Sequence, residues 1–192
     1  GSGGTKRKAT RQQLRDLLAA VAQWYQVQLR SSAGAPARAY LEQRGIDQET
    51  IQTFGLGYSP DAWRDTLEWG RRNGYSHELM LKTGMAKRKE TESGEDQIND
   101  RFRGRLLFPI SDELGNVIGF SARTLEKDTE AAKYLNSPDT PLFNKKRVLY
   151  GLHLARTAFP ATGGALVCEG QLDVIACHRA GQTTRAFELD QA

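Results

Sequence analysis

The sequence has few cysteines, and those present do not form a metal-binding pattern. There are only two, Cys168 and Cys177, and neither belongs to a CxxC motif. Both fall in apolar segments, so we expect them to be buried as small hydrophobic side chains. We therefore expect no zinc site in this chain. Two isolated cysteines without a signal sequence are typical of a reducing compartment, and we expect a cytoplasmic protein.

Long hydrophobic runs are also lacking. No apolar segment approaches the roughly 20 residues that a membrane helix needs, so we expect no membrane partner. Hydrophobic residues make up 39% of the chain and charged residues 26%, which argues against a disordered chain. Residues 1–4, with the sequence GSGG, are interpreted as a cloning scar.

Positive charge is in excess and is unevenly distributed. The formal net charge of +4 indicates a polyanionic partner only weakly. The distribution is more informative, because basic residues gather in three places, which are 6–11, 101–105 and 145–147. The first group is typical of a solvated helix end, and the second is the hardest to explain in that way.

The N-terminal half is predicted to be mainly helical. Apolar residues from Leu14 to Leu29 recur at helical spacing and predict an amphipathic helix over 11–30. Asp47 is a suitable N-cap for a later helix, and glycines end several others. The further predicted helices are 37–43, 48–54, 63–73 and 77–83. We expect a strand or turn at 55–60 and an exposed loop or hairpin tip at 87–99.

The pattern changes at Asp100 from helical to strand-like. An apolar run over 106–110, a turn over 112–116 and a second run over 117–122 predict an antiparallel pair of strands. The later predictions are a turn-rich segment at 133–141, a strand at 165–168, a helix at 172–179, and a strand beginning after Gly181.

Glu169 occupies a position where ligands often bind. It follows a predicted apolar strand directly and precedes Gly170 and a helix, so its carboxylate is expected at the carboxyl end of the strand. Asp173 falls in the first turn of that helix. A surface glutamate and a residue that compensates the helix dipole are the simpler interpretations of these two acids.

Alternating arginines precede the first buried strand. Arg101, Arg103 and Arg105 have the period of two that would place their side chains on one face of a strand. Three guanidinium groups on one face favour a phosphate partner. The alternative is a strand end neutralised by nearby acids, namely Asp100, Asp112 and Glu113.

A second basic region lies further along the chain. Lys133, Tyr134 and Asn136 precede the contiguous cations Lys145 to Arg147. Cations beside an aromatic and an amide suit single-stranded nucleic acid, which offers backbone charge and base faces. The spacing by itself is weak support.

Together these segments resemble the RNA-polymerase core of bacterial DNA primases. The matching stretches are RFRGRLLFPISDELGNVIGFSARTL, KYLNSPDTPLFNKKRVLYGL and LVCEGQLDVIACHRAG. The upstream stretch AYLEQRGIDQETIQTFGLGYSPDAW is similar to the preceding helical segment of that family. The resemblance runs from about Leu17 to Gly181. The EGxxDVIA pattern belongs to the wider Toprim fold, whereas KYLNSPxTPLFxK is specific to primases.

The resemblance implies roles for individual residues. Glu169 would bind a divalent metal, Mg²⁺ or Mn²⁺, or assist nucleotidyl transfer, and Asp173 would be the second acid of the same motif. Gln171 stands where the family usually has an aromatic residue, so base stacking there is not expected. The template groove and nucleotide site would be lined by Arg44, Arg101, Arg103, Arg123, Lys133, Asn136, Lys145 and Arg147.

The resemblance also implies partners, which are a single-stranded DNA template, nucleoside triphosphates and an RNA–DNA hybrid. A replicative helicase would bind regions that this chain lacks. Further acids on later Toprim strands would complete the metal site in the family. Because this chain shows no such acids, we expect it to be inactive in primer synthesis by itself.

We predict an α/β fold. A mixed α/β primase-core subdomain over 5–160 would lead into the first strand and helix of an incomplete, Rossmann-like Toprim sheet over 161–192. With that sheet unfinished, the strand at 165–168 would lie at an exposed edge. Two alternatives remain, which are a non-catalytic module that binds nucleic acid or a replication partner, and a Toprim protein that is not a primase.

Overall fold

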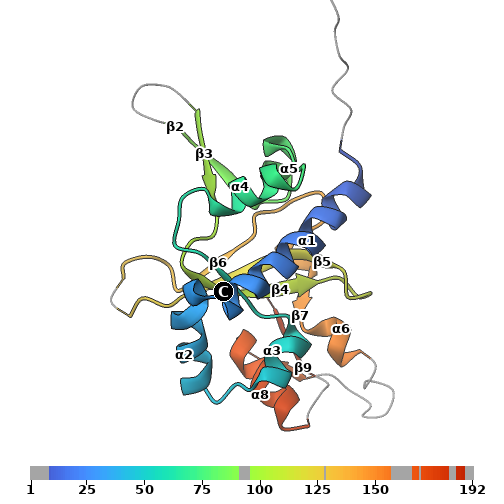
Figure 1. Cartoon of the computed structure of the whole chain (residues 1–192). Coiled ribbons are helices and arrows are strands. Elements are labelled where there is room, and N and C mark those ends of the chain that lie inside the picture. The colour runs from blue at the N-terminus through green and yellow to red at the C-terminus, as the bar shows by residue number, and fades with distance from the viewer. Residues whose placement is uncertain are drawn as a thin grey trace, which may run out of the picture.

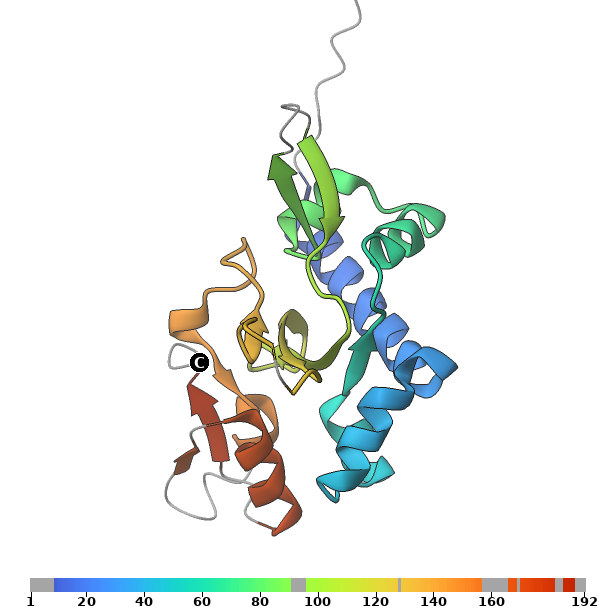
Figure 2. The same ribbon diagram turned by 90° about the vertical axis from the view of Figure 1, so that its left-hand side faces the viewer.

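A central antiparallel sheet organises the molecule. The computed structural model describes residues 9–90, 96–127, 129–156, 166–168, 170–181 and 185–188. Within these residues the central sheet has helices on both faces, and a smaller sheet lies beside it (Figure 1). A two-stranded hairpin extends from the other end of the molecule (Figure 2). In this part of the chain no helix is both long and apolar enough to cross a membrane.

Helix α1 (Arg11–Arg30) has the bounds predicted from its apolar spacing. Thr10 begins it with a capping box, in which its hydroxyl accepts from the amide of Gln13 and the Gln13 side chain accepts from the Thr10 amide. Its buried side packs on the central sheet, where Tyr25 meets Phe120 edge-on at 5.5 Å between ring centroids. The apolar face predicted from the sequence is therefore the buried face of the helix.

The shorter helices follow the local signals closely. Asp47 caps α3 (Gln48–Phe54), accepting from the amide of Thr50 at 2.9 Å. Helix α2 (Ala35–Gln43) begins before the predicted start, because Pro36 lies in its first turn, where proline is tolerated. A 3₁₀ turn η1 (Ser32–Gly34) precedes it, and α4 (Asp65–Arg72) and α5 (His77–Lys82) follow near their predicted places.

The central sheet has the strand order β1 (Gly57–Ser59), β4 (Arg105–Ser111), β5 (Val117–Thr124) and β6 (Tyr134–Asn136). All neighbouring pairs are antiparallel, and β4 and β5 form the predicted strand pair. Strand β6 was not predicted, since the composition of 133–141 indicates turns. It has only three residues, and its pairing with β5 stabilises it more than any local propensity.

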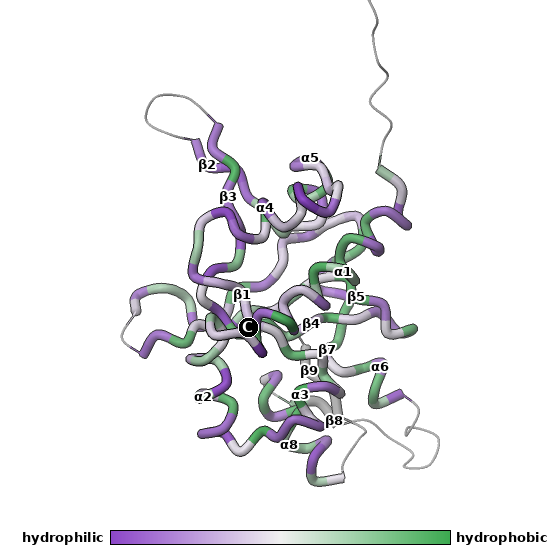
Figure 3. The backbone as a smooth tube through the Cα atoms, viewed as in Figure 1, coloured by the Kyte–Doolittle hydropathy of each residue, from purple (hydrophilic) through white to green (hydrophobic). Residues whose placement is uncertain are grey.

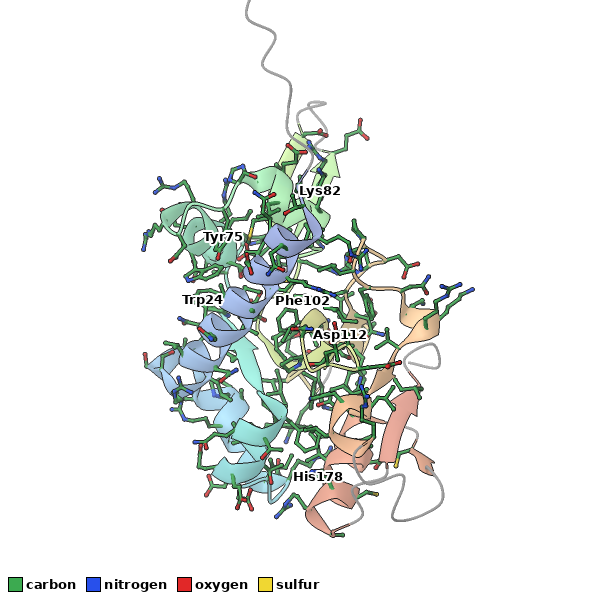
Figure 4. All side chains as sticks on the ribbon, turned by 90° about the vertical axis from the view of Figure 1, so that its right-hand side faces the viewer. Trp24, Tyr75, Lys82, Phe102, Asp112 and His178 are labelled. Carbon is green, nitrogen blue, oxygen red and sulfur yellow. The ribbon has the colours of Figure 1, made fainter. Side chains whose placement is uncertain are left out.

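Strand β4 is buried on both faces, which explains its continuous apolar run. Leu106, Phe108 and Ile110 belong to one hydrophobic cluster, together with residues of α2 and α3. Leu107 belongs to a second cluster, formed mainly with α1, α4 and α5. Phe102, beside α1 in Figure 4, is buried in this second cluster.

The predicted loop at 87–99 is a hairpin of two strands, β2 (Ala86–Glu90) and β3 (Asp96–Asp100). Within 87–99 Asn99 is buried, as are the flanking residues Ala86 and Asp100, so the base of the hairpin is not exposed. Its strands carry mostly hydrophilic residues (Figure 3). The hairpin prediction is thus confirmed, and the expectation that the whole segment is exposed is wrong.

The smaller sheet has the order β7 (Leu149–Tyr150), β9 (Arg185–Glu188) and β8 (Leu166–Cys168). Strands β8 and β9 are parallel, and α8 (Gln171–Arg179) lies between them in sequence, as expected for a βαβ unit. Among the described strands β8 pairs only with β9 and so lies at an edge. Its assignment to a Toprim sheet remains a prediction.

Helix α8 also packs against the helical half of the molecule. His178, near α3 in Figure 4, contacts the Phe54 ring edge-on at 5.2 Å. Cys168 and Cys177 are half-buried, with their sulfur atoms 3.9 Å apart, so the expectation that both are buried is wrong. Two short helical segments, η2 (Lys145–Arg147) and α6 (Leu152–Ala155), flank β7.

Candidate nucleic-acid interface

Two adjoining cavities open beside the end of β5. The first has a volume of about 590 Å³ and the second about 710 Å³. Both are lined by the segment Thr124 to Glu126 and by Ala131, so they meet along the chain that leaves β5. Together they form a concave surface to which several of the predicted basic residues contribute.

The first cavity is strongly cationic. Its described lining carries Lys87, Arg101, Arg103 and Arg105 against two acids, Asp61 and Glu126. Burial and then the nearby charges of Arg103 and Arg101 lower the pKa of Lys87. The cavity therefore concentrates positive charge that repels itself, and an anion would relieve that repulsion.

Arg101 and Arg105 are held in place by backbone carbonyls. The Arg101 guanidinium donates to the carbonyl oxygen of Asn136 from Nε at 3.2 Å and from Nη2 at 2.7 Å. Arg105 donates from Nη1 to the carbonyl oxygens of Ala122 and Ala132, each at 3.1 Å. Burial lowers the pKa of both arginines. Arg101 thus links the segment before β4 to β6, and Arg105 links β4 to β5 and to the chain before β6. Both side chains also present positive charge to the cavity.

Arg103 is held differently. Its Cζ lies 3.4 Å from the centroid of the Trp63 ring, which is a close cation–π stack. Within the described part of the chain, Arg103 has no ion pair or hydrogen bond of its side chain. Trp63 is 53% exposed. A flat guanidinium on an exposed indole is suited to phosphate and base contacts with single-stranded nucleic acid.

The arginines share this cavity for a reason other than the one predicted. Gly104 has a φ of +58°, so the backbone from Arg101 to Arg105 is not one extended strand, and β4 begins only at Arg105. The period-two argument for a single strand face is therefore wrong. The turn at Gly104 brings the same three side chains to one cavity.

The second cavity combines cations with a tyrosine. The Cζ atoms of Arg44 and Arg123 each lie 5.2 Å from the Tyr40 ring centroid, and Arg123 also lies 5.4 Å from the Tyr134 ring. Lys127 and Lys133 complete the basic lining, against one acid, Glu126. Burial raises the pKa of Tyr40, so the ring stays neutral between the two arginines.

The structure gathers only some of the predicted site residues. Arg101 and Arg103 line the first cavity, and Arg44, Arg123 and Lys133 line the second. Asn136 lies in β6, and its backbone carbonyl binds Arg101. Three others lie apart from both cavities, with Lys145 and Arg147 in η2 and Asp173 in the first turn of α8. Glu169 lies outside the described residues.

The alternative in which nearby acids neutralise the arginines is wrong. Asp100 accepts hydrogen bonds from the amides of Thr66 and Leu67. Asp112 pairs with Arg15, and Glu113 with Arg156. The described structure shows none of these three acids in an ion pair with Arg101, Arg103 or Arg105.

Two cations and two aromatic residues of the site were not predicted, namely Lys87, Lys127, Tyr40 and Trp63. Lys87 belongs to a polar segment whose composition is typical of an exposed loop. Tyr40 and Trp63 fall in predicted helices, and the sequence around them does not indicate that arginine side chains contact their rings. An aromatic residue near a basic segment is the only signal that could have indicated them.

The described residues do not form a metal site by themselves. No three His, Cys, Asp or Glu side chains among them come together in a way that could hold an ion. Asp173 is exposed on α8. Gln171, where the family resemblance suggests an aromatic residue, is buried and donates to Ser121 Oγ at 2.8 Å, so it has a structural contact.

The fold and the cavities define a mixed α/β domain with a strongly basic concave surface. The family model for the N-terminal domain of the DNA primase catalytic core matches residues 24–156. This chain therefore belongs to the DNA primase catalytic-core family. Membership excludes the alternative of a Toprim protein outside the primases.

The relatives extend this result over most of the chain. The DNA primase of Streptomyces coelicolor is 43% identical over 164 residues, which are 85% of this chain and 25% of that protein. The DNA primase of Escherichia coli K12 is 37% identical over 182 residues, 94% of this chain and 30% of that protein. The chain thus spans between a quarter and a third of the length of these two relatives.

Solved structures agree in fold. The RNA polymerase domain of Mycobacterium tuberculosis primase DnaG, in complex with a double-stranded DNA oligomer with a 6-nucleotide overhang, matches with a TM-score of 0.86 and 36% identity. That match covers 95% of this chain and 56% of the other. A DnaG primase catalytic domain bound to ssDNA matches with a TM-score of 0.81 and 37% identity, covering 93% and 56%.

Proposed function

We propose that this chain holds single-stranded DNA template in a primase that makes RNA primers from nucleoside triphosphates. The observation that carries the proposal is Arg103 stacked on the exposed ring of Trp63, in a cavity lined by three further cations. Support comes from the related catalytic domain bound to ssDNA. Cations supply backbone contacts and the aromatic ring supplies a sequence-tolerant stacking surface.

The two cavities suit two parts of the reaction. The first holds the template through Arg101 and Arg103. The second, with Arg44, Arg123 and Lys133 around Tyr40, receives the triphosphate of a nucleotide or the hybrid backbone. Arginine forks match phosphate oxygens, and neighbouring cavities would keep template and nucleotide side by side.

We assign the metal-dependent step to two acids beside the smaller sheet. Glu169 follows β8 in the sequence and Asp173 lies in the first turn of α8, and we propose that both contribute carboxylate oxygens to a Mg²⁺ or Mn²⁺ site completed by other parts of the whole protein. Lys145 and Arg147 would contact nucleic acid outside the two cavities. Helicase binding and a cytoplasmic location belong to the same proposal.

A titration of fluorescent single-stranded DNA against salt tests template binding. We expect tight binding at low salt, and Arg103→Gln should reduce the dependence of log K on log[salt] by about 0.7, the share of one phosphate contact. Arg71→Gln is the matched control, because Arg71 is exposed on α4 and pairs with Glu68. Binding that is absent at low salt, or equal in the two variants, would refute the proposal.

The metal assignment needs a separate measurement. In the whole protein, Glu169→Gln and Asp173→Asn should each abolish primer synthesis while single-stranded DNA binding remains unchanged. Arg103→Gln should weaken both. Primer synthesis that survives both acid substitutions would show that these carboxylates do not serve the reaction.

A further inference from the structure

The β2–β3 hairpin has two chemically different faces. Residues directly opposite in an antiparallel pair share a face, and successive residues along each strand lie on opposite faces. The register pairs Lys87 with Asn99 and Lys89 with Gln97, so these four residues share one face. The other face carries Arg88 and Ile98, with Glu90 opposite Asp96 and Ala86 opposite Asp100.

Charge is separated between these faces. The Lys87–Lys89 face has two cations and no acid, whereas the opposite face has one cation and three acids. Arg88 pairs with Asp96 on that second face at 3.0 Å. The opposite face is also the one that anchors the hairpin, since Ala86 and Ile98 pack in the cluster with α4 and α5.

The cationic face is continuous with the first cavity. Lys87 lines that cavity together with Arg101, Arg103 and Arg105. Lys89, two residues further along β2, is exposed, and its charge acts on Lys87. The two lysine Cα atoms are about 7 Å apart along a strand, a spacing comparable to that of successive phosphates in an extended single strand. The hairpin extends away from the body (Figures 1 and 2), so this face continues the basic surface outward.

We propose that the Lys87–Lys89 face of the hairpin binds the phosphate backbone of the template strand beyond the segment held in the first cavity. The inference rests on the proposed function, because the strand must first occupy that cavity. The surface suits nucleic acid in particular, because its two lysines follow one another along a straight ribbon and point charges of this kind track a backbone without reading its sequence. The hairpin thereby lengthens the bound segment of template.

The expected signature is a contribution that depends on strand length. The probes are poly-dT strands of about 6 and about 16 nucleotides, within the range of site sizes of single-strand-binding domains. For the longer strand, Lys87→Gln/Lys89→Gln should reduce the slope of log K against log[salt] by about 1.4 in magnitude. Each lysine contributes about 0.7, because it no longer neutralises one phosphate. The effect on the shorter strand should be at most half as large, because that strand reaches no further than the cavity and Lys87.

The control is Lys82→Gln/Arg88→Gln, which also removes two positive charges, but from side chains that do not belong to the Lys87–Lys89 face. Lys82 pairs with Glu78 on α5 and Arg88 with Asp96, so neither faces the cavity. We expect this variant to bind both strands like the wild type. Thermal unfolding of both variants establishes that the fold is intact, since all four side chains lie at the surface or half-exposed.

The outcomes separate the two proposals. If Arg103→Gln weakens binding while Lys87→Gln/Lys89→Gln equals its control at both lengths, template binding stands and the hairpin inference is overturned. Equal losses at both lengths also overturn it, because the lysines would then act only within the cavity. If the wild type does not bind single-stranded DNA at low salt, both proposals fail.

Discussion

The carboxylate of Asp100 accepts a hydrogen bond of 2.8 Å from the backbone amide of Thr66. A second bond of 2.9 Å comes from the amide of Leu67. These amides are in the first turn of α4, where the N-cap residue Arg64 offers no side-chain cap. The last residue of the hairpin therefore caps a helix that lies far away in sequence, and it fixes the hairpin to the body.

This cap makes the stability of the chain dependent on pH. Burial raises the pKa of Asp100 from 3.8 to about 6, although the two amides favour the charged form. The folded state thus holds the proton more tightly than the unfolded state. The contribution of Asp100 to the free energy of unfolding is largest below about pH 4 and declines until about pH 6, by up to about 3 kcal/mol.

Asp100→Asn tests this coupling. The variant does not titrate at this position, so its deficit in the free energy of unfolding relative to the wild type is largest at low pH and should decrease by up to about 3 kcal/mol as the pH rises to 6. Urea unfolding at several pH values between 4 and 7 measures the difference. A deficit that does not change with pH would contradict the assignment.

The buried pair Gln171 and Ser121 should couple α8 to the central sheet. Gln171→Ala removes the donor to Ser121 Oγ and leaves a cavity, so we expect a loss of about 2 kcal/mol in the free energy of unfolding. A double-mutant cycle with Ser121→Ala should give a coupling of about 1 kcal/mol. Additive effects would mean that the two residues act independently.

Removing the Trp63 ring should weaken template binding. Trp63→Leu abolishes the stack with Arg103 and any stacking of a base, so we expect a loss of about 1 kcal/mol, or roughly fivefold in Kd. Leu114→Ala is the control, because Leu114 is another exposed large hydrophobic residue and lies in the β4–β5 turn. Titration of single-stranded DNA at low salt measures both. Equal affinities in the two variants would exclude a role for the ring.

Two glycines should respond to substitution for different reasons. A Cβ at Gly57 would lie 2.7 Å from the Tyr25 Cβ, so Gly57→Ala forces α1 away from β1 and should cost about 1–3 kcal/mol. Gly74 has open space around it but a φ of +80°, so Gly74→Ala should cost about 1 kcal/mol. Chemical unfolding ranks the two, and a smaller effect at Gly57 would contradict the close approach.

Local signals in the sequence determined most of the helices and the buried strand pair. Asp47 as an N-cap, the glycines after α2 and α4, and the apolar spacing of α1 each act within a few residues, so they can be read without the fold. The run from Leu106 to Ile110 indicated a buried strand for the same reason. The basic residues of the candidate site were also visible as clusters.

The tertiary structure alone decided which of those residues come together. Strand β6 exists because β5 pairs with it, and Asp100 caps α4 instead of pairing with the arginines. Lys87 joins Arg101 and Arg103 because the hairpin folds back on itself, while Lys145 and Arg147 lie elsewhere. These arrangements depend on contacts between residues distant in sequence. Composition and spacing carry no information on such contacts, because loop closure and packing establish them only in the folded chain.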